Sequence, residues 1–332
     1  MITVPLPVPL TVPLTVPLTE IVGGLKFPEG PLSLPDGGLL FVECWRGTLS
    51  RWDATHGYRV VADLGGRPAS VAKGPDGRFY VCNDGGRNEQ ETEAALASGV
   101  DLSDDGGIEP GGGLIQVVSS LETGGFETLY TQSDGWPIGA ANDLVFDEWG
   151  GFYFTDFVKR SRRMMTRGRV CYALPDGSSV HDVIAPIDTP NGIGLSPDGR
   201  TLYVAQADHA RLWAFEVRGP GDVVTLNRPG LGGRLLFTAP GFCGFDSLGV
   251  DGEGFIVVAT TGTGCLTVVA PDGSSYEQID VGDRHVTNIC WGGPDLRTAY
   301  VTLGGSGRIV SLPWARPGLA PHFARLVIEP TW

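Results

Sequence analysis

Basic residues are scarce in this sequence: 24 Lys and Arg stand against 38 Asp and Glu, which gives a formal net charge of −14. Binding to nucleic acid or to an anionic membrane surface relies on clustered Lys and Arg, so the charge argues against both kinds of partner. Runs of 18 apolar residues are missing too, which argues against a membrane-spanning helix. We expect an acidic protein that acts on a small molecule; its oligomeric state stays open.

Cysteine pairs and a secretory signal are also lacking. The six cysteines form no C-x-x-C pair, and a chain that can bury a sizeable core needs no disulfide staples, so we expect free thiols. The Pro-rich segment 1–20 has no basic stretch and predicts an extended, disordered tail, although a strand edge or a partner could dock it. With no secretory signal, the cytoplasm is the expected compartment.

Several catalytic motifs are absent from the chain. The sequence contains no G-x-S-x-G elbow, no H-E-x-x-H helix and no Walker loop, and its five histidines show no metal-ligand spacing. These absences argue against the serine, zinc and phosphate-loop chemistries that depend on those motifs.

Glycine and proline, by contrast, are abundant at 50 and 25 residues, which is typical of short strands joined by tight turns. A unit with an apolar stretch, a Pro-Asp-Gly-like turn and an apolar strand recurs six times, and a further strand opened by a small residue follows each copy. The units repeat at roughly 40 to 55 residues, the length of a four-stranded propeller blade. We therefore predict an all-β fold, a six-bladed β-propeller with a central channel over residues 21–332. A β-sandwich would not explain the sixfold repeat.

One residue of each unit should occupy the same level of the channel. Counting back from the turns and following the apolar frame gives Glu29, Ala69, Asn142, Asn191, Asp246 and Asn288. Five of the six are polar, and buried carboxylates and amides that face one axis must be paired, hydrated or coordinated to a cation. Their oxygens suit calcium, magnesium, manganese or zinc. The pattern predicts either a site for one divalent metal ion or a polar, water-filled channel.

Four segments resemble the SMP-30/gluconolactonase/LRE family of regucalcin-like lactonases. They are FPEGPLSLPDGGLLFVE, NDLVFDEWGGFYFTD, TPNGIGLSPDGRTLYVAQ and FDSLGVDGEGFIVVAT, and the similarity runs from about Ile21 to the end of the chain. The resemblance implies a six-bladed propeller with one divalent cation bound by a Glu, two Asn and an Asp. Those ligands fall on four residues that we call the quartet: Glu29, Asn142, Asn191 and Asp246.

The resemblance also implies hydrolysis of a lactone or a similar cyclic ester, a carboxylic ester hydrolase activity. In this account the metal polarises the carbonyl, and Asp246 is both a ligand and the base that deprotonates water. Two alternatives stay open: a non-catalytic propeller that binds calcium or a partner, and a different metal-assisted reaction such as phosphotriester hydrolysis, a lyase step or a condensation. The substrate and the physiological metal also stay open.

Three strand ends supply candidate substrate contacts. Asn83, Asp156 and Gln206 occupy one equivalent position in three blades, where they could bind substrate or hydrogen-bond to neighbouring blades. His209 follows shortly after Gln206 and could shuttle a proton, although a loop histidine is more often a bystander. An acidic, Gly-rich insertion at residues 87–112 could be a lid over the channel or a solvated loop.

Overall fold

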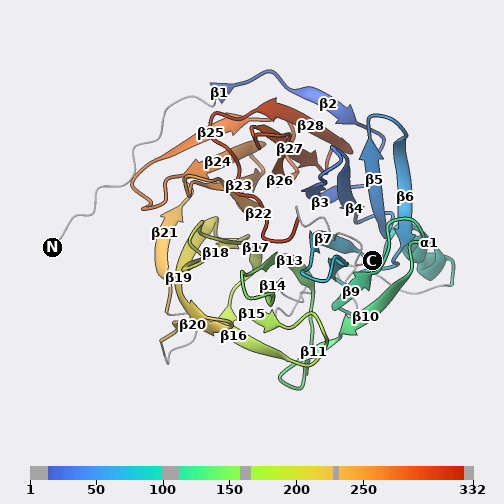
Figure 1. The fold of residues 1–332 in the computed structure, drawn as a ribbon, viewed down its shortest axis with the longest axis horizontal. Helices are drawn as coiled ribbons and strands as arrows, with labels where there is room; N and C mark the ends of the chain where they lie inside the picture. Colours follow the sequence, from blue (N-terminus) through green and yellow to red (C-terminus); the bar gives the residue numbers. More distant parts are fainter. Residues whose placement is uncertain (1–13, 99–111, 158–165, 227–231, 325–332) are drawn as a thin grey trace, which may run out of the picture.

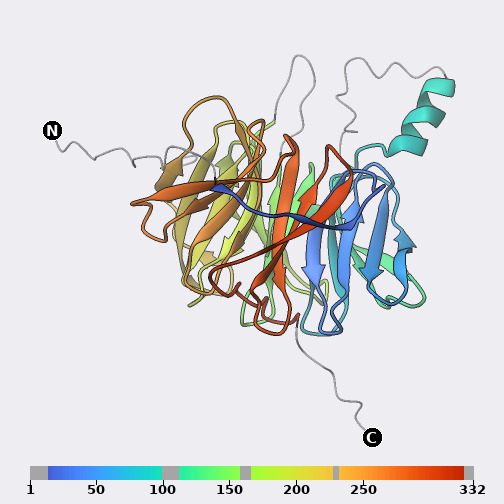
Figure 2. The same ribbon diagram turned by 90° about the horizontal axis from the view of Figure 1, so that it is seen from above.

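The computed structural model describes residues 14–98, 112–157, 166–226 and 232–324. Within these ranges, six antiparallel sheets stand around a central axis like the blades of a propeller, as Figure 1 shows. The side view in Figure 2 shows the blades standing side by side in a short, wide cylinder. The predicted fold class is confirmed.

Each blade contributes one strand to the channel wall and three strands behind it. The innermost strands are β3 (Pro28–Ser33), β7 (Pro68–Lys73), β13 (Ala141–Phe146), β17 (Pro190–Leu195), β22 (Gly244–Val250) and β26 (Val286–Gly292). The second strands are β4 (Leu39–Glu43), β8 (Phe79–Asn83), β14 (Phe152–Asp156), β18 (Thr201–Gln206), β23 (Ile256–Thr261) and β27 (Thr298–Leu303).

The outer half of each blade follows the same order. The third strands are β5 (Thr48–Asp53), β9 (Leu114–Val118), β15 (Gly168–Ala173), β19 (Arg211–Gly219), β24 (Cys265–Val269) and β28 (Arg308–Pro313). The outermost strands are β6 (Gly57–Asp63), β10 (Phe126–Tyr130), β16 (Val180–Ile187), β21 (Arg234–Thr238), β25 (Tyr276–Asp280) and β2 (Thr19–Val22). A short β20 (Asp222–Val223) also pairs with β19, and β11 (Gln132–Ser133) with β12 (Trp136–Pro137) forms a separate hairpin.

The repeated Pro-Asp-Gly turns join the first strand of a blade to the second. In blade 1, Gly37 adopts a φ of 83°, a left-handed conformation that costs glycine little, and its N–H donates to the Leu34 carbonyl over 3.0 Å. The Asp36 carboxylate accepts the N–H of Gly38 over 2.9 Å, which closes the turn. This turn chemistry produces the repeated meander.

The N-terminal segment closes the ring. β2 pairs antiparallel with β28 and so completes the sixth blade, while β1 (Leu14–Thr15) pairs parallel with β25 of the fifth blade. The expectation of a disordered tail does not hold for these strands, because the edges of blades 5 and 6 offer them backbone hydrogen bonds. β2 begins two residues before the expected start of the propeller at residue 21.

The hydrophobic core is divided into six clusters, each between two neighbouring blades. Between blades 2 and 3, for example, Tyr80 packs edge-on against Phe146 at 5.1 Å between ring centroids. Since every blade buries both faces, the ring has no open end. All six cysteines are free, and four of them are buried.

The two ends of the channel differ. We call the end at which the innermost strands begin the channel mouth. At the opposite end, residues 319–322 help to line a cavity of about 180 Å³ in the channel, and the Leu319 N–H donates to the Val250 carbonyl over 3.2 Å. A buried ion pair of Arg316 with Asp251 anchors this segment. The segment therefore lies across this end of the channel.

The insertion at residues 87–112 contains one helix, α1 (Glu89–Ala97), and residues 99–111 lie outside the described part of the chain. Asn88 caps the helix, and a reciprocal bond from Glu91 completes a capping box. In Figures 1 and 2, α1 stands at the outer rim on the mouth side, beside blades 1 and 2. The helix does not cover the channel. No helix in the described ranges has the length and apolar character needed to cross a membrane.

Candidate metal centre at the channel mouth

The innermost strands share an irregularity close to where they begin. The pairing of β3 with β4 shifts register after Glu29, and the pairings of β13, β17 and β22 shift after Ala141, Pro190 and Phe245. Such bulges re-aim side chains and are frequent beside active sites. The shifts occur at the same depth of four blades. They place the four residues of the quartet at one level of the channel.

The sixth blade has the same kind of bulge, but one residue nearer the start of the strand. The register of β26 against β27 shifts between Val286 and Asn288, and Asn288 lies four residues before the last strand residue, Gly292, as Glu29 lies four residues before Ser33. Asn288 accepts the N–H of Ile289 over 2.7 Å, as Asp143 accepts that of Leu144 over 2.9 Å. The bulge lies before Asn288 in the chain, so Asn288 keeps the position that counting back from the turn gives it.

Three carboxyl groups lie close together near this level: Glu29 and Asp143, whose side chains are buried, and Asp246, which is half-buried. Burial raises the pKa of Glu29 well above its ordinary value, and the charges of Asp246 and Asp143 raise it further. Burial raises the pKa of Asp246 to about 7, although the side chain of Asn191 and the backbone of Ser247 donate hydrogen bonds to it. The chain has thus gathered negative charge that its own residues do not neutralise.

One side-chain atom of Asn191 also lacks a hydrogen-bond partner. Its side chain is 8% exposed, and its Oδ1 has no hydrogen-bond partner among the described residues. A buried amide oxygen without a partner costs about 1–3 kcal/mol. A cation would satisfy this oxygen and relieve the repulsion between Glu29 and Asp246, so the donor set fits a divalent metal that prefers oxygen ligands.

Asn142 completes the set from β13, where it is half-buried. Among the residues that the structure describes, no group of three or more His, Cys, Asp or Glu has metal-binding geometry. The quartet contributes only two such residues, and amide oxygens supply the rest. A hard, oxygen-only site of this kind suits calcium, magnesium or manganese better than a thiolate or imidazole site would.

Asp143 connects the walls of the channel beneath the quartet. Burial raises its pKa to about 7, and its carboxylate accepts the N–H groups of Leu144 in its own strand and Ile193 in β17, the latter over 3.3 Å. The Thr155 hydroxyl also donates to the carbonyl of Asn191 over 2.7 Å. These bonds tie blade 3 to blade 4 next to two quartet residues.

The three strand-end residues occupy one equivalent position, as expected. Asn83 pairs with Pro68, Asp156 with Ala141, and Gln206 with Pro190, each opposite the first residue of an innermost strand. All three side chains are buried.

Their polar atoms are engaged within their own blades. The Asn83 amide donates to the Gly65 carbonyl and to Gln116, and Gln206 donates to the Asp188 carbonyl and accepts the Trp213 indole N–H. These bonds account for the burial without a ligand. They anchor the loops that lead into the innermost strands.

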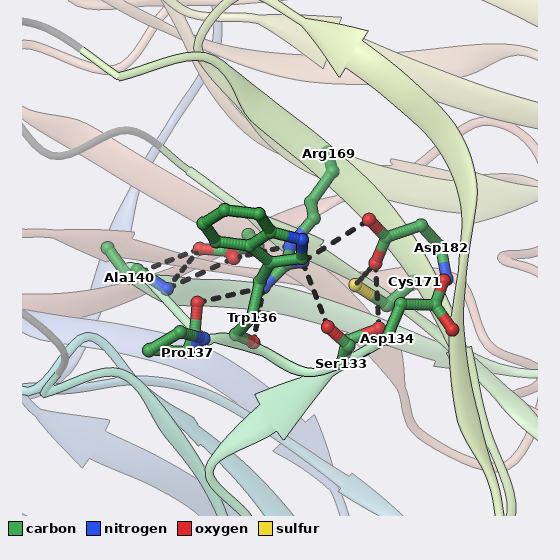
Figure 3. Close-up of polar contacts among 10 residues, drawn as sticks. Ser133, Asp134, Trp136, Pro137, Ala140, Arg169, Cys171 and Asp182 are labelled. Atoms are coloured by element: carbon green, nitrogen blue, oxygen red, sulfur yellow. Dashed lines mark hydrogen bonds and ion pairs between the residues drawn. The ribbon is translucent and has the colours of Figure 1, made fainter.

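Asp156 has the most extensive of these networks, drawn in Figure 3. Its carboxylate accepts the N–H groups of Gly139 and Ala140, the two residues before β13, over 2.7–3.0 Å. Arg169 donates its Nε to Asp156 over 2.9 Å and its other nitrogens to Asp182 and to the carbonyls of the β11–β12 hairpin. The network fixes the chain just ahead of Asn142.

Glu43 is a fourth member of this set that was not predicted from the sequence. Glu43 pairs with Pro28 and is fully buried, and it accepts hydrogen bonds from the Lys26 N–H, Ser50, Tyr58 and the Arg46 guanidinium. An alignment of the last two residues of the second strands, Val42-Glu43 in blade 1 with Cys82-Asn83 in blade 2, would have identified Glu43. His209, in contrast, lies exposed in the turn between β18 and β19.

Comparisons with known proteins agree with this architecture. Residues 27–305 match the SMP-30/Gluconolactonase/LRE-like region family. Lactonase drp35 of Staphylococcus saprophyticus is 32% identical over 212 residues, which cover 64% of this chain and 56% of that protein. Its Staphylococcus aureus (strain USA300) counterpart is 31% identical over 221 residues, covering 65% and 57%. The chain therefore spans little more than half the length of these relatives.

Solved structures share the fold at lower identity. A gluconolactonase from Xanthomonas campestris superposes with a TM-score of 0.67 at 21% identity, covering 89% of both chains. A calcium-binding protein, regucalcin, from Agrobacterium tumefaciens superposes with a TM-score of 0.69 at 18% identity, covering 93% of this chain and 97% of that one. The family match extends over most of the sequence and includes all four quartet residues. The chain belongs to the SMP-30/gluconolactonase/LRE-like family.

Proposed function

We propose that this protein is a divalent-metal-dependent hydrolase of a lactone or a similar cyclic ester, with the metal held by the quartet. The observation that carries the proposal is the unpartnered, buried Oδ1 of Asn191 beside the Glu29 and Asp246 carboxyl groups. The lactonase and gluconolactonase relatives support the class of reaction. A bound cation would supply Lewis-acid polarisation of the ester carbonyl.

The residues of the chain divide the remaining tasks. Glu29, Asn142 and Asn191 hold the cation, and Glu29 neutralises part of its charge. Asp246, which receives hydrogen bonds from Asn191 and from the Ser247 N–H, is oriented to take the proton of the attacking water. Asp143 stays beneath the quartet and keeps the strands of Asn142 and Asn191 in register. His209 and the strand-end residues do not take part in the chemical step.

A lactone panel with and without a chelator tests the proposal. The purified protein should contain or bind about one divalent ion and hydrolyse at least one simple lactone, and a chelator should abolish that hydrolysis. Calcium, magnesium, manganese and zinc are restored one at a time to identify the effective ion. Metal binding without hydrolysis of any ester would favour a binding propeller, and hydrolysis only of a phosphotriester would assign another reaction to the same site.

A further inference from the structure

Aromatic side chains precede three of the innermost strands in the sequence. Phe27 stands two residues before Glu29 and Phe242 four residues before Asp246, whereas Trp136 belongs to the β11–β12 hairpin, which packs against the outermost strand β16 of blade 3. Trp136 is 72% exposed and Phe242 is fully exposed, although large aromatic side chains are usually buried. Solvent-exposed apolar rings beside a reactive site indicate that the ligand covers them.

The aromatic pair next to Glu29 is the most firmly built of these. The rings of Phe27 and Trp45 stack with centroids 4.9 Å apart, and Trp45 is still 46% exposed. The Phe27 ring also packs close to Thr287 in β26, because both side chains approach the same point beside Gly304. We call Phe27 and Trp45 the aromatic platform.

The backbone holds the aromatic platform rigidly. Phe27 has a φ of 56°, a conformation that a bulky residue rarely adopts and that costs on the order of 1–3 kcal/mol. Backbone bonds from Cys44 to Phe27, from Trp45 to Lys26, and from Glu89 in α1 to Trp45 maintain it. A pre-organised platform loses little conformational entropy when a ligand binds.

Most polar groups near the platform are already engaged, and the exposed His285 ring lies beside Phe27 at 6.4 Å between ring centroids. Recognition of a sugar lactone requires side chains that bind its hydroxyl groups, but the Asn83, Asp156 and Gln206 groups are bonded within their blades. Closer to the platform, Lys26 pairs with Glu89, and Arg46 pairs with Glu43. The mouth therefore offers a large apolar contact and few hydroxyl-binding groups.

From this arrangement we propose that the substrate is a lactone with an apolar alkyl or aryl substituent that packs on Phe27 and Trp45, rather than a polyhydroxylated sugar lactone. The inference rests on the proposed function. The ester ring lies at the quartet, and the substituent extends across the aromatic platform. Each methylene that packs there should contribute about two- to fourfold to binding.

Two measurements test the proposal separately from the lactonase activity itself. The first follows kcat/KM of the metal-loaded protein for γ-lactones from γ-butyrolactone to γ-nonalactone, with glucono-δ-lactone for comparison. We expect kcat/KM to rise with chain length to at least tenfold above γ-butyrolactone. Trp45→Ala should remove the rise, so that the longer lactones are hydrolysed no faster than γ-butyrolactone by the same variant, and Trp45→Phe should restore part of it.

Trp149→Ala is the matched control, because Trp149 is 51% exposed in the β13–β14 turn at the other end of the channel. This variant should keep the full dependence on chain length. A flat dependence, or one that survives Trp45→Ala, would overturn the inference even if γ-butyrolactone is hydrolysed.

The second measurement is calorimetric binding of non-hydrolysable ketones, cyclopentanone and 2-heptylcyclopentanone, to the same metal-loaded proteins. We expect at least tenfold tighter binding of the heptyl ketone, which Trp45→Ala abolishes. Equal affinities would overturn the inference. Tight, Trp45-dependent binding without hydrolysis of any lactone would support the apolar ligand and contradict the proposed reaction.

Discussion

The side chain of Asn191 donates a hydrogen bond to the Asp246 carboxylate, while its own Oδ1 has no partner among the described residues. The Asn191 side chain thus donates to the Asp246 carboxylate through its amide nitrogen and leaves its amide oxygen free to accept a further bond in the channel. Glu29 lies close enough for the Asp246 charge to raise its pKa. A cation between these groups would complete the coordination that the side chains begin.

Replacing Asn191 by aspartate tests that relationship. The Asn191→Asp variant adds a third carboxylate to the quartet, so the metal-free protein should be less stable than wild type at pH 8 because like charges repel. The same change should tighten divalent-metal binding about tenfold, because affinity follows the number of charged ligands. Thermal unfolding with chelator and with metal measures both effects. Unchanged metal affinity would contradict the assignment of Asn191 as a ligand.

Asp246→Asn tests the proposed base. The amide cannot accept a proton from water, so kcat/KM for a lactone should fall at least about 100-fold while the protein stays folded. Circular dichroism and a metal titration measured beside the kinetics separate the loss of the base from the loss of the ion. The control is Glu253→Gln, an exposed carboxylate in the β22–β23 turn. Wild-type turnover by Asp246→Asn would rule out the role.

The dependence of stability on pH should reveal the buried carboxyl groups. Asp143 and Asp246 have pKa values of about 7 in the folded chain, against an ordinary value of 3.8, and that of Glu29 is raised as well. The stability that these groups contribute is present below their unfolded pKa values and is lost as the pH rises through about 7. With chelator present, the melting temperature should therefore rise when the pH is lowered from 8 to 6.

Added metal should reverse this trend, since the ion binds the deprotonated groups and stabilises the protein more at pH 8 than at pH 6. Asp246→Asn should weaken both pH effects. A melting temperature of the metal-free protein that falls between pH 8 and pH 6 would contradict the account of these carboxyl groups.

The Arg169 network should be important for stability. Arg169 and Asp156 have side chains that are only 11% and 6% exposed, so Arg169→Met leaves a buried carboxylate without its partner. We expect a loss of about 3 kcal/mol in the free energy of unfolding, measured with denaturant. Arg218→Met is the control, because the Arg218–Glu216 pair is about 60% exposed on both sides and contributes little. Equal effects of the two variants would show that the network is not structural.

Much of the architecture could be predicted from the sequence because turn chemistry repeats. The second strands of blades 1 and 6 begin at Leu39 and Thr298, in each case three residues after the Asp of the turn, Asp36 or Asp295. The positions of the bulges could not be predicted, since β26 shifts register between Val286 and Asn288 but β3 between Glu29 and Leu32, and the sequence does not mark the difference. The role of Glu43 depends on long-range partners such as Tyr58, which only the folded blade brings together.

The central claim is that one divalent ion at the quartet is required for ester hydrolysis. The most direct measurement is the rate of γ-butyrolactone hydrolysis by chelator-treated protein as divalent metal is added back in fractions of an equivalent. The account predicts no activity at the start, a linear rise and a plateau at one equivalent per chain, with Glu29→Gln requiring a large excess of metal. Full activity without metal, or no activity at saturation with any of the four ions, would contradict it.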